Sequence, residues 1–440
     1  MKALLFLSAI AVACAPRLPP TGQVLLYVDT DAWVPSLFDA LEVEVQGRDR
    51  TQCANCSRVF ALDAKGFADR AVSFGVLGNE RVVRLRMYTT TATLSGAVPE
   101  RDDGVTPQSV IEAWVRLPAA PAEGILERTV VLRTEDVGTS RGTFDAPIDP
   151  DIGPPVHSVV GSWPGAKTVD CPVEGNPDEV CVPGGAFWMG NPYARGLPGY
   201  GNASNVRRLV RMSPFFLDAA EVTVAQYRSF DTTIPPGTSG DGSVQSDYCT
   251  FGKNDSLPVN CVTWERARTF CTARGRDLPT EAQFEFAAGG RAGNLFVWGN
   301  DSGVGCEDLI FGRAGPKLLL SIVTVCNKGR LLELAAPMPP GSGARDHLTL
   351  PTGRIEDLAG NVSEWARDLW NQQSDPCWSD GGVFVDPLCP GTDPKALHAA
   401  RGGYWFASTA AYSEAAARRS IAGNTADIAV GFRCARDLRP

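Results

Sequence analysis

The chain has 440 residues, with 41 Lys and Arg against 50 Asp and Glu, so its formal net charge at pH 7 is −9. This length suits two domains of unequal size, and the 44% of apolar residues can fill both cores. Nucleic-acid binding depends on clustered Lys and Arg that neutralise phosphates, and the sequence has no basic run. The composition therefore argues against a nucleic-acid partner.

The amino terminus has the layout of a short export signal, with Lys2, the apolar run ALLFLSAIAVA and then Cys14. The run is too short to span a bilayer permanently. Small residues directly before a cysteine resemble the lipobox of bacterial lipoproteins, so we expect residues 1–13 to be a signal peptide and Cys14 to be lipidated. The alternative is a plain secreted protein in which Cys14 is free or removed. Either way we expect export, and a lipid anchor would hold the protein at a membrane, in the periplasm or on the cell surface.

Residues 22–137 show period-two alternation of apolar and polar residues, as in ALEVEVQ, VVRLRMY and IEAWVRL. Such strands separated by Gly, Pro and Asp turns predict a small antiparallel β-sandwich. Residues 138–170 are rich in Gly, Pro and Asp and lack periodicity, so we interpret them as a linker.

The second predicted domain spans residues 171–438. Thr223 with Gln226, and Thr280 with Gln283, match the capping box that starts a helix. The second of these helices, LPTEAQFEF, has acidic residues among apolar ones, which favours a solvated acidic face. Helical spacing of Trp264, Ala267, Phe270 and Cys271 predicts a third helix with Cys271 on its buried face. Long Gly-rich connections make this domain loop-rich.

The cysteines favour an oxidising compartment. Removing Cys14 from the 13 leaves an even number, which implies disulfides, although sequence alone does not fix their connectivity. A zinc site at CANC would need a second close ligand pair nearby, and none exists. Close spacing and elimination favour these pairs: Cys53–Cys56, Cys171–Cys181, Cys249–Cys261, Cys306–Cys326, Cys377–Cys389 and Cys271–Cys434.

Five motifs occur in order: CVPGGAFWMG (181–190), FFLDAAEVTVAQYRSF (215–230), PVNCVTWERARTFCTARGRDLPTEAQFEFAAGGR (258–291), DLAGNVSEWARD (357–368) and RGGYWF through GFRCA (401–435). Together they resemble the formylglycine-generating enzyme domain, also called the sulfatase-modifying factor domain. The resemblance covers roughly residues 171–438 and implies a variant of the C-type lectin fold. The fold class we expect is thus α+β, with a loop-rich, disulfide-bonded lectin-like domain after a small all-β sandwich. The resemblance also implies the Cys271–Cys434 bridge.

Members of this family that make formylglycine oxidise a substrate cysteine at a copper ion held by two cysteines after the RGG motif. Cu(I) is a soft ion that prefers paired thiolates. In this sequence those two positions fall on Ala407 and Tyr412, and no cysteine occurs between Arg401 and Cys434. Copper is therefore not expected. Two further departures lie near the family's substrate groove, since Tyr404 replaces a serine and Ser363 replaces a tryptophan.

The resemblance also implies a calcium site in the GNVSEW loop, made by the side chains of Asp357 and Glu364 and the carbonyls of Gly360 and Val362. Hard oxygen ligands on a turn suit Ca²⁺, which would rigidify the loop. The alternative is that both acids cap the loop or face solvent. A related branch uses histidine-bound iron, but the three histidines, His157, His347 and His398, show no close ligand spacing.

These patterns favour an exported protein whose sulfatase-modifying-factor domain binds a protein or peptide partner, or supports envelope assembly, without catalysis. The alternative is a formylglycine-generating oxidase acting on a cysteine of a sulfatase-type protein. Glu364 and Glu414 are the acid/base candidates for any other chemistry in the groove. Carbohydrate binding would rest on the fold alone.

Overall fold

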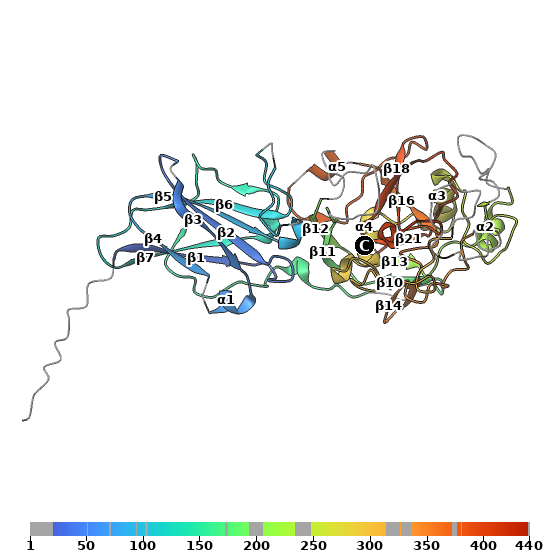
Figure 1. Ribbon diagram of the computed structural model, residues 1–440, viewed down its shortest axis with the longest axis horizontal. Coiled ribbons are helices and arrows are strands. Elements are labelled where there is room, and N and C mark those ends of the chain that lie inside the picture. Colours follow the sequence, from blue (N-terminus) through green and yellow to red (C-terminus); the bar gives the residue numbers. More distant parts are fainter. Residues whose placement is uncertain are drawn as a thin grey trace, which may run out of the picture.

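The computed structural model describes residues 21–50, 52–69, 72–93, 95–101, 104–171, 175–192, 206–233, 248–313, 326, 336–371, 376–379 and 381–438. The molecule is elongated, with an all-β unit at one end and a loop-rich mixed unit at the other (Figure 1). We call the first the sandwich (residues 21–166) and the second the C-terminal domain (residues 171–438). Cys14 and the side chain of Cys53 lie outside the described residues, so lipidation and the Cys53–Cys56 pair stay predictions. Within those residues no helix is both long and apolar enough to cross a bilayer.

Two sheets pack on one apolar core in the sandwich. The alternating residues predicted to point inward do so: Leu41, Val83 and Ile111 are all fully buried. One sheet has the order β4-β1-β7-β9 and the other β3-β2-β5-β6-β8. The strands are β1 (Gln23–Thr30), β2 (Ala40–Gly47), β3 (Gln52–Ala61), β4 (Ser73–Val76), β5 (Arg81–Tyr88), β6 (Val110–Leu117), β7 (Ile125–Leu132), β8 (Ser140–Arg141) and β9 (Asp151–Ile152), with the short helices α1 (Ala64–Ala68), η1 (Thr90–Ala92), η2 (Thr134–Asp136) and η3 (Pro164–Ala166) between or after them.

The strand directions differ in part from the prediction. β1 pairs with β7 in parallel over its full length, so the sandwich is mixed rather than purely antiparallel. Between β1 and β7 the chain builds β2, β3, β5 and β6 of the second sheet and returns once to the first sheet as β4. This long crossover makes a parallel pairing possible.

The segment predicted to be a linker, residues 138–170, is instead part of the sandwich. β8 and β9 add short edge strands to the two sheets. Trp163 is 2% exposed and belongs to the sandwich core. The Gly and Pro residues that suggested a linker lie in the turns between these short elements. A single buried tryptophan is too little periodicity to reveal such packing from sequence.

The described part of the C-terminal domain contains four small sheets rather than one large one. β10 (Glu179–Val182) and β21 (Ala435–Asp437) flank β13 (Phe215–Asp218), so the two ends of the domain meet in one sheet (Figure 1). The other sheets have the orders β11-β12-β17, β14-β15 and β19-β18-β16-β20. Their strands are β11 (Gly185–Met189), β12 (Arg208–Met212), β14 (His347–Leu350), β15 (Gly353–Glu356), β16 (Ser363–Leu369), β17 (Phe384–Val385), β18 (Leu397–Arg401), β19 (Arg418–Ala422) and β20 (Val430–Gly431).

Both predicted capping boxes are formed. Thr223 caps α2 (Val224–Phe230) and Thr280 caps α4 (Glu281–Ala288), each with the reciprocal glutamine bond. The third predicted helix is α3 (Trp264–Ala273), and its four spaced residues are its buried ones. The remaining short helices are η6 (Gly290–Ala292), α5 (Pro376–Ser379) and η7 (Ala410–Ser413).

The prediction that α4 has a solvated acidic face is wrong. Every residue of α4 is buried, including Glu281 and Glu285. The Glu281 carboxylate pairs with Arg418 at 2.5 Å, and Glu285 pairs with Arg401. Both arginines are themselves buried, so α4 forms a paired ionic layer inside the domain.

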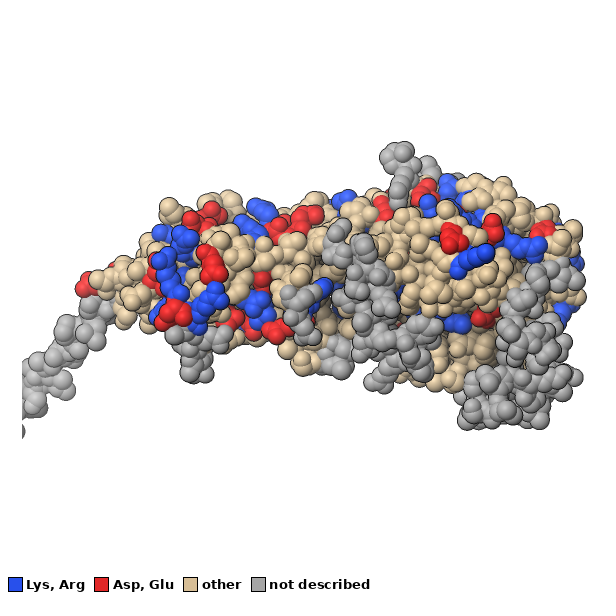
Figure 2. Space-filling view, turned by 90° about the horizontal axis from the view of Figure 1, so that it is seen from above, with Lys and Arg blue, Asp and Glu red and all other residues tan. Residues whose placement is uncertain are grey.

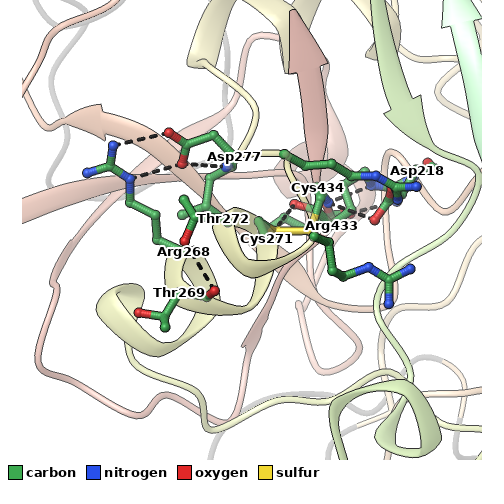
Figure 3. The surroundings of a disulfide bond; sticks show 12 residues. Asp218, Arg268, Thr269, Cys271, Thr272, Asp277, Arg433 and Cys434 are labelled. Carbon is green, nitrogen blue, oxygen red and sulfur yellow. Dashed lines mark hydrogen bonds and ion pairs between the residues drawn. A yellow bond between two sulfur atoms is a disulfide. The ribbon is translucent and has the colours of Figure 1, made fainter. Parts of the chain in front are cut away.

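Five of the six predicted cysteine pairs are disulfides in the structure: Cys171–Cys181, Cys249–Cys261, Cys271–Cys434, Cys306–Cys326 and Cys377–Cys389. Cys271–Cys434 joins α3 to the residue before β21, with 5.5 Å between the Cα atoms (Figure 3). Beside it, Asp218 accepts a hydrogen bond from the Cys434 amide at 2.9 Å. This bridge closes the longest loop of the five and fixes the end of the domain to its early helix.

The two units share a packed interface. The Trp188 indole donates to the Leu37 carbonyl at 2.7 Å, and its ring meets Phe38 edge-on at 5.3 Å. Leu209 of β12 is fully buried within the sandwich core. The C-terminal domain therefore completes the hydrophobic core of the sandwich, and the two units are not joined by a free tether.

Candidate functional site

The loop after β18 carries the RGG motif. Gly402 has φ +77°, a conformation that L side chains rarely adopt, and a Cβ on Gly403 would lie 2.6 Å from the Ala359 carbonyl oxygen. The close approach allows two bonds between loops: Gly403 N donates to Ala359 at 2.9 Å, and Trp405 N donates to Asn361 at 2.7 Å. These bonds hold the segment 403–407 against the loop 359–361. Glycine at position 403 permits this close approach.

Ala407 and Tyr412 lie in the same apolar cluster. Ala407 is fully buried with Leu309, Phe311 and Ala359, and Tyr412 packs against this group from its edge. The Ala407 carbonyl accepts a hydrogen bond from Gly312 N at 2.9 Å. The structure thus brings together the two positions that the family resemblance assigns to copper ligands, and a methyl group and a phenol ring lie there.

Ser363 and Tyr404, the two other departures from the family motifs, are joined by Arg419. The Arg419 guanidinium donates to Ser363 Oγ at 3.2 Å and lies over the Tyr404 ring, 4.6 Å from its centroid. The Tyr404 ring also meets Tyr412 at 5.6 Å. Burial raises the pKa of Tyr404, although Arg419 opposes the shift. Ser363, Tyr404 and Arg419 therefore form one contacting unit of side chains.

The predicted calcium loop is formed from residues with unusual backbone conformations. Asp357 has φ 54° and Asn361 has φ 63°, both in the left-handed region. The Oδ2 atom of Asp357 accepts from Gly341 N at 2.5 Å, while its buried Oδ1 atom has no hydrogen-bond partner in the described structure. This oxygen is a ready ligand for a hard cation.

Glu364, the second predicted side-chain ligand, is held by Arg433. The guanidinium donates to its two carboxylate oxygens at 2.7 and 2.6 Å, and both residues are fully buried. Arg433 also donates to the carbonyls of Glu356 and Asp357, at 2.8 and 3.1 Å. Burial raises the pKa of Glu364, while Arg433 lowers it. Glu364 is therefore a paired core residue and not an acid exposed in a groove.

Two further buried acids surround the same loop, and the sequence patterns did not indicate them. Glu221 accepts from Val362 N at 3.0 Å and from the Asn361 amide at 2.7 Å. Asp346 accepts from the backbone N–H groups of Ala359 and Gly360 at 2.8 and 2.7 Å. Burial, and then the charge of Asp357, raises the pKa of both carboxyls well above the usual range.

The cluster thus contains more buried carboxylates than guanidinium groups. Burial raises the pKa of Asp357 to about 7. Within the described ranges, no three His, Cys, Asp or Glu side chains are arranged to hold a metal ion. A calcium site in this loop would therefore rest on the Asp357 side chain and on the carbonyls of Gly360 and Val362 more than on Glu364.

The remaining candidate residues are dispersed. Glu414 lines an open groove near η7, away from its fellow acid/base candidate Glu364, which is inside the core. His398 is buried and stacks on Trp264 at 3.8 Å, and His347 lies in β14. The structure does not bring the histidines or the two glutamates together.

The C-terminal domain combines many short strands, few helices and long loops with several disulfides, and this architecture is that of a C-type lectin-like domain. A family model of the sulfatase-modifying factor enzyme 1-like domain matches residues 166–314 and 351–438. This match covers more than half of the chain. The chain belongs to the sulfatase-modifying factor enzyme 1-like domain family.

Some of the similar curated proteins are named as formylglycine-generating enzymes, and others are named as inactive relatives of them. A protein named formylglycine-generating enzyme from Streptomyces coelicolor is 27% identical over 304 residues, which is 59% of this chain and 89% of that protein. A protein named inactive C-alpha-formylglycine-generating enzyme 2 from Mus musculus is 27% identical over 312 residues, covering 59% of this chain and 86% of that protein. Among solved structures, PvdO from Pseudomonas aeruginosa aligns with a TM-score of 0.40 and 19% identity, over 62% of this chain and 99% of that chain.

Proposed function

We propose that the C-terminal domain is a non-catalytic sulfatase-modifying-factor domain that binds a protein or peptide partner. The observation that carries this proposal is the buried cluster at Ala407 and Tyr412. A Cu(I) ion prefers two thiolates, and a methyl group and a phenol cannot replace them. Cys326 packs against the cluster, but its sulfur is bound to Cys306.

The departures at Ser363 and Tyr404, which are both contacted by Arg419, support the same conclusion. A site that had only lost its metal ligands would keep the rest of its groove unchanged. Here Arg419 occupies the space beside Ser363 and stacks on Tyr404. The new side chains form a packed arrangement of their own, which favours a role that does not need the original groove shape.

The alternative function is formylglycine generation by other residues, which the names of some similar proteins favour. Incubation of the protein with copper, oxygen and a peptide containing a CxPxR sequence separates the two. We expect mass spectrometry to find the peptide cysteine unchanged. An aldehyde at that cysteine, formed in proportion to protein concentration, would refute the non-catalytic role.

We also propose that the loop 357–364 binds Ca²⁺ through Asp357 Oδ1 and neighbouring carbonyls. The buried excess of carboxylates supports a cation there, because unpaired buried negative charge is unfavourable. Millimolar calcium should then raise the melting temperature of the wild-type protein relative to EGTA, and should have no effect on Asp357→Asn. A wild-type melting temperature that does not change with calcium would exclude this site.

We also propose that the protein is exported and held at a membrane by a lipid anchor at Cys14. In that location it would support assembly of the cell envelope. Support comes from the apolar run before Cys14 and from the disulfides of the mature chain. Metabolic labelling with a fatty-acid analogue should mark the wild-type protein and not Cys14→Ser. Equal labelling of both proteins, or of neither, would contradict the anchor.

A further inference from the structure

A groove of about 720 Å³ lies where the sandwich meets the C-terminal domain. Thr91 and Thr93, at η1 of the sandwich, line one wall. The C-terminal domain supplies the remaining surface, with Asn191 and Arg207, with residues from the loop 295–302, and with residues 409–411 and Glu414 around η7. The volume falls in the range of small ligand sites. Neither unit forms this groove alone.

The wall from the sandwich is held in place by direct contacts. Arg207 Nε donates to the Thr91 carbonyl at 3.1 Å, so a residue of the groove ties the two units together at the groove itself. Deeper in the interface, Arg208 Nε donates to the Gln108 side chain at 3.4 Å, and Gln108 donates to the Trp378 carbonyl. Such contacts pre-form the groove, which reduces the entropy lost when a ligand binds.

The lining suits a neutral ligand that makes many hydrogen bonds. Six of the twelve described residues that line it have hydroxyl or amide side chains. Arg207 and Glu414 contribute one charge of each sign, and on the face in Figure 2 acidic and basic side chains are interspersed over the surface. A strongly charged ligand would gain no net attraction from this pattern.

The apolar part of the lining favours a peptide over a sugar. A sugar ring commonly packs on an exposed aromatic face. Among the described lining residues the aromatic one is Phe296, which is 2% exposed and stacked on Trp298 at 4.8 Å. Leu295, by contrast, is 38% exposed, and Ala410 and Ala411 leave space beside η7. Small apolar surfaces between hydrogen-bonding groups match the alternating backbone and side chains of an extended peptide.

We infer that the sandwich and the C-terminal domain together bind an extended, uncharged segment of a partner polypeptide, with Thr91 and Thr93 as the wall that the sandwich supplies. This inference rests on the proposed binding function and names where the partner lies. It also gives the sandwich, which lies almost wholly outside the family match, a direct part in recognition.

The test uses the full chain and a phage-displayed library of random linear peptides as the probe. Peptides enriched on the wild-type protein are measured against Thr91→Trp, which fills the groove from the sandwich, and Ala411→Trp, which fills it from η7. Thr91 is exposed and its contact to Arg207 uses the backbone, so this variant keeps the interface. Thr272→Trp, on the exposed side of α3, is the matched control.

We expect uncharged peptides to be enriched, and both groove variants to weaken their binding at least about tenfold while Thr272→Trp does not. Hydrogen exchange on the wild-type protein should show protection by the peptide in both 89–93 and 409–411. Failure to enrich any peptide, enrichment of strongly charged peptides, or loss of binding and protection on the η7 side alone would overturn the composite groove. Aldehyde formation in the peptide assay would instead overturn the non-catalytic role without changing this result.

Discussion

Arg433 and Glu364 form a fully buried ion pair with two hydrogen bonds, at the point where the loop 357–364 meets the strand end that carries Cys434. Both residues lie in motifs that resemble the family, GFRCA and GNVSEW. Figure 3 shows Arg433 next to the Cys271–Cys434 disulfide. The pair therefore links the candidate calcium loop to the bridge that closes the domain.

Removal of one partner should destabilise the protein strongly. Glu364→Gln removes the carboxylate that accepts two hydrogen bonds from Arg433 in a fully buried site, so we expect a loss of about 3–5 kcal/mol in the free energy of unfolding. Urea denaturation measures this loss. The double variant Glu364→Gln/Arg433→Met should recover little of it, because the loss of Arg433 leaves the buried carboxyls of Glu221 and Asp357 without their cation. A loss below about 1 kcal/mol for the single variant would show that the pair is not desolvated.

The buried acids should make stability depend on pH. Burial raises the pKa of Asp357 to about 7 and that of Asp218 to about 6 in the folded protein, against an ordinary value near 3.8. Between the ordinary and the raised pKa of these acids, the folded state binds more protons than the unfolded state. The free energy of unfolding therefore falls as pH rises from about 4 to about 7. In EGTA, the melting temperature should be higher at pH 5 than at pH 7.5. Asp357→Asn should flatten this slope, and an unchanged slope would contradict the assignment to Asp357.

Leu209 should affect both units, because it belongs to the C-terminal domain and is buried in the sandwich core. Leu209→Ala is expected to destabilise the protein by about 2–5 kcal/mol. Unfolding followed by tryptophan fluorescence should remain a single transition that moves to lower urea. If the variant instead shows two separated transitions with one unchanged, the two units fold independently and the shared core is not energetically important.

The Cys271–Cys434 bridge should contribute most among the five disulfides. It spans a sequence separation of 163, against 10 to 20 for the others. Restriction of the unfolded chain over a loop of this length is worth about 5 kcal/mol in the chain-entropy model. The Cys271→Ala/Cys434→Ala variant should therefore lose more stability than Cys249→Ala/Cys261→Ala. The reverse order would show that native contacts, and not the loop length, decide the effect.

The sequence predicted features that depend on neighbouring residues. The Thr223–Gln226 and Thr280–Gln283 caps and the period-two strands follow from spacings within a few residues. The prediction of a solvated face on α4 was wrong because the partners of Glu281 and Glu285 are Arg418 and Arg401, more than a hundred residues further along the chain. No local pattern carries that information.

The residues of the candidate site also divide into those that local sequence could predict and those that it could not. The positions of Ala407 and Tyr412 could be predicted because the RGG motif precedes them directly. Glu221 and Asp346 could not, since each reaches the loop 357–364 from a distant segment and neither stands in a recognisable ligand pattern. The misassigned linker has the same cause, because Trp163 finds its place only in the assembled sandwich core.

The central claim is most directly tested by anaerobic titration of the wild-type protein with Cu(I) in the presence of a coloured competing chelator, beside the variant Ala407→Cys/Tyr412→Cys. We predict that the wild-type protein leaves the copper with the chelator, while the variant, with two thiols restored in one cluster, withdraws it. The account would be contradicted if the wild-type protein removed Cu(I) from the chelator at a one-to-one ratio and a single substitution within residues 404–412 abolished this removal.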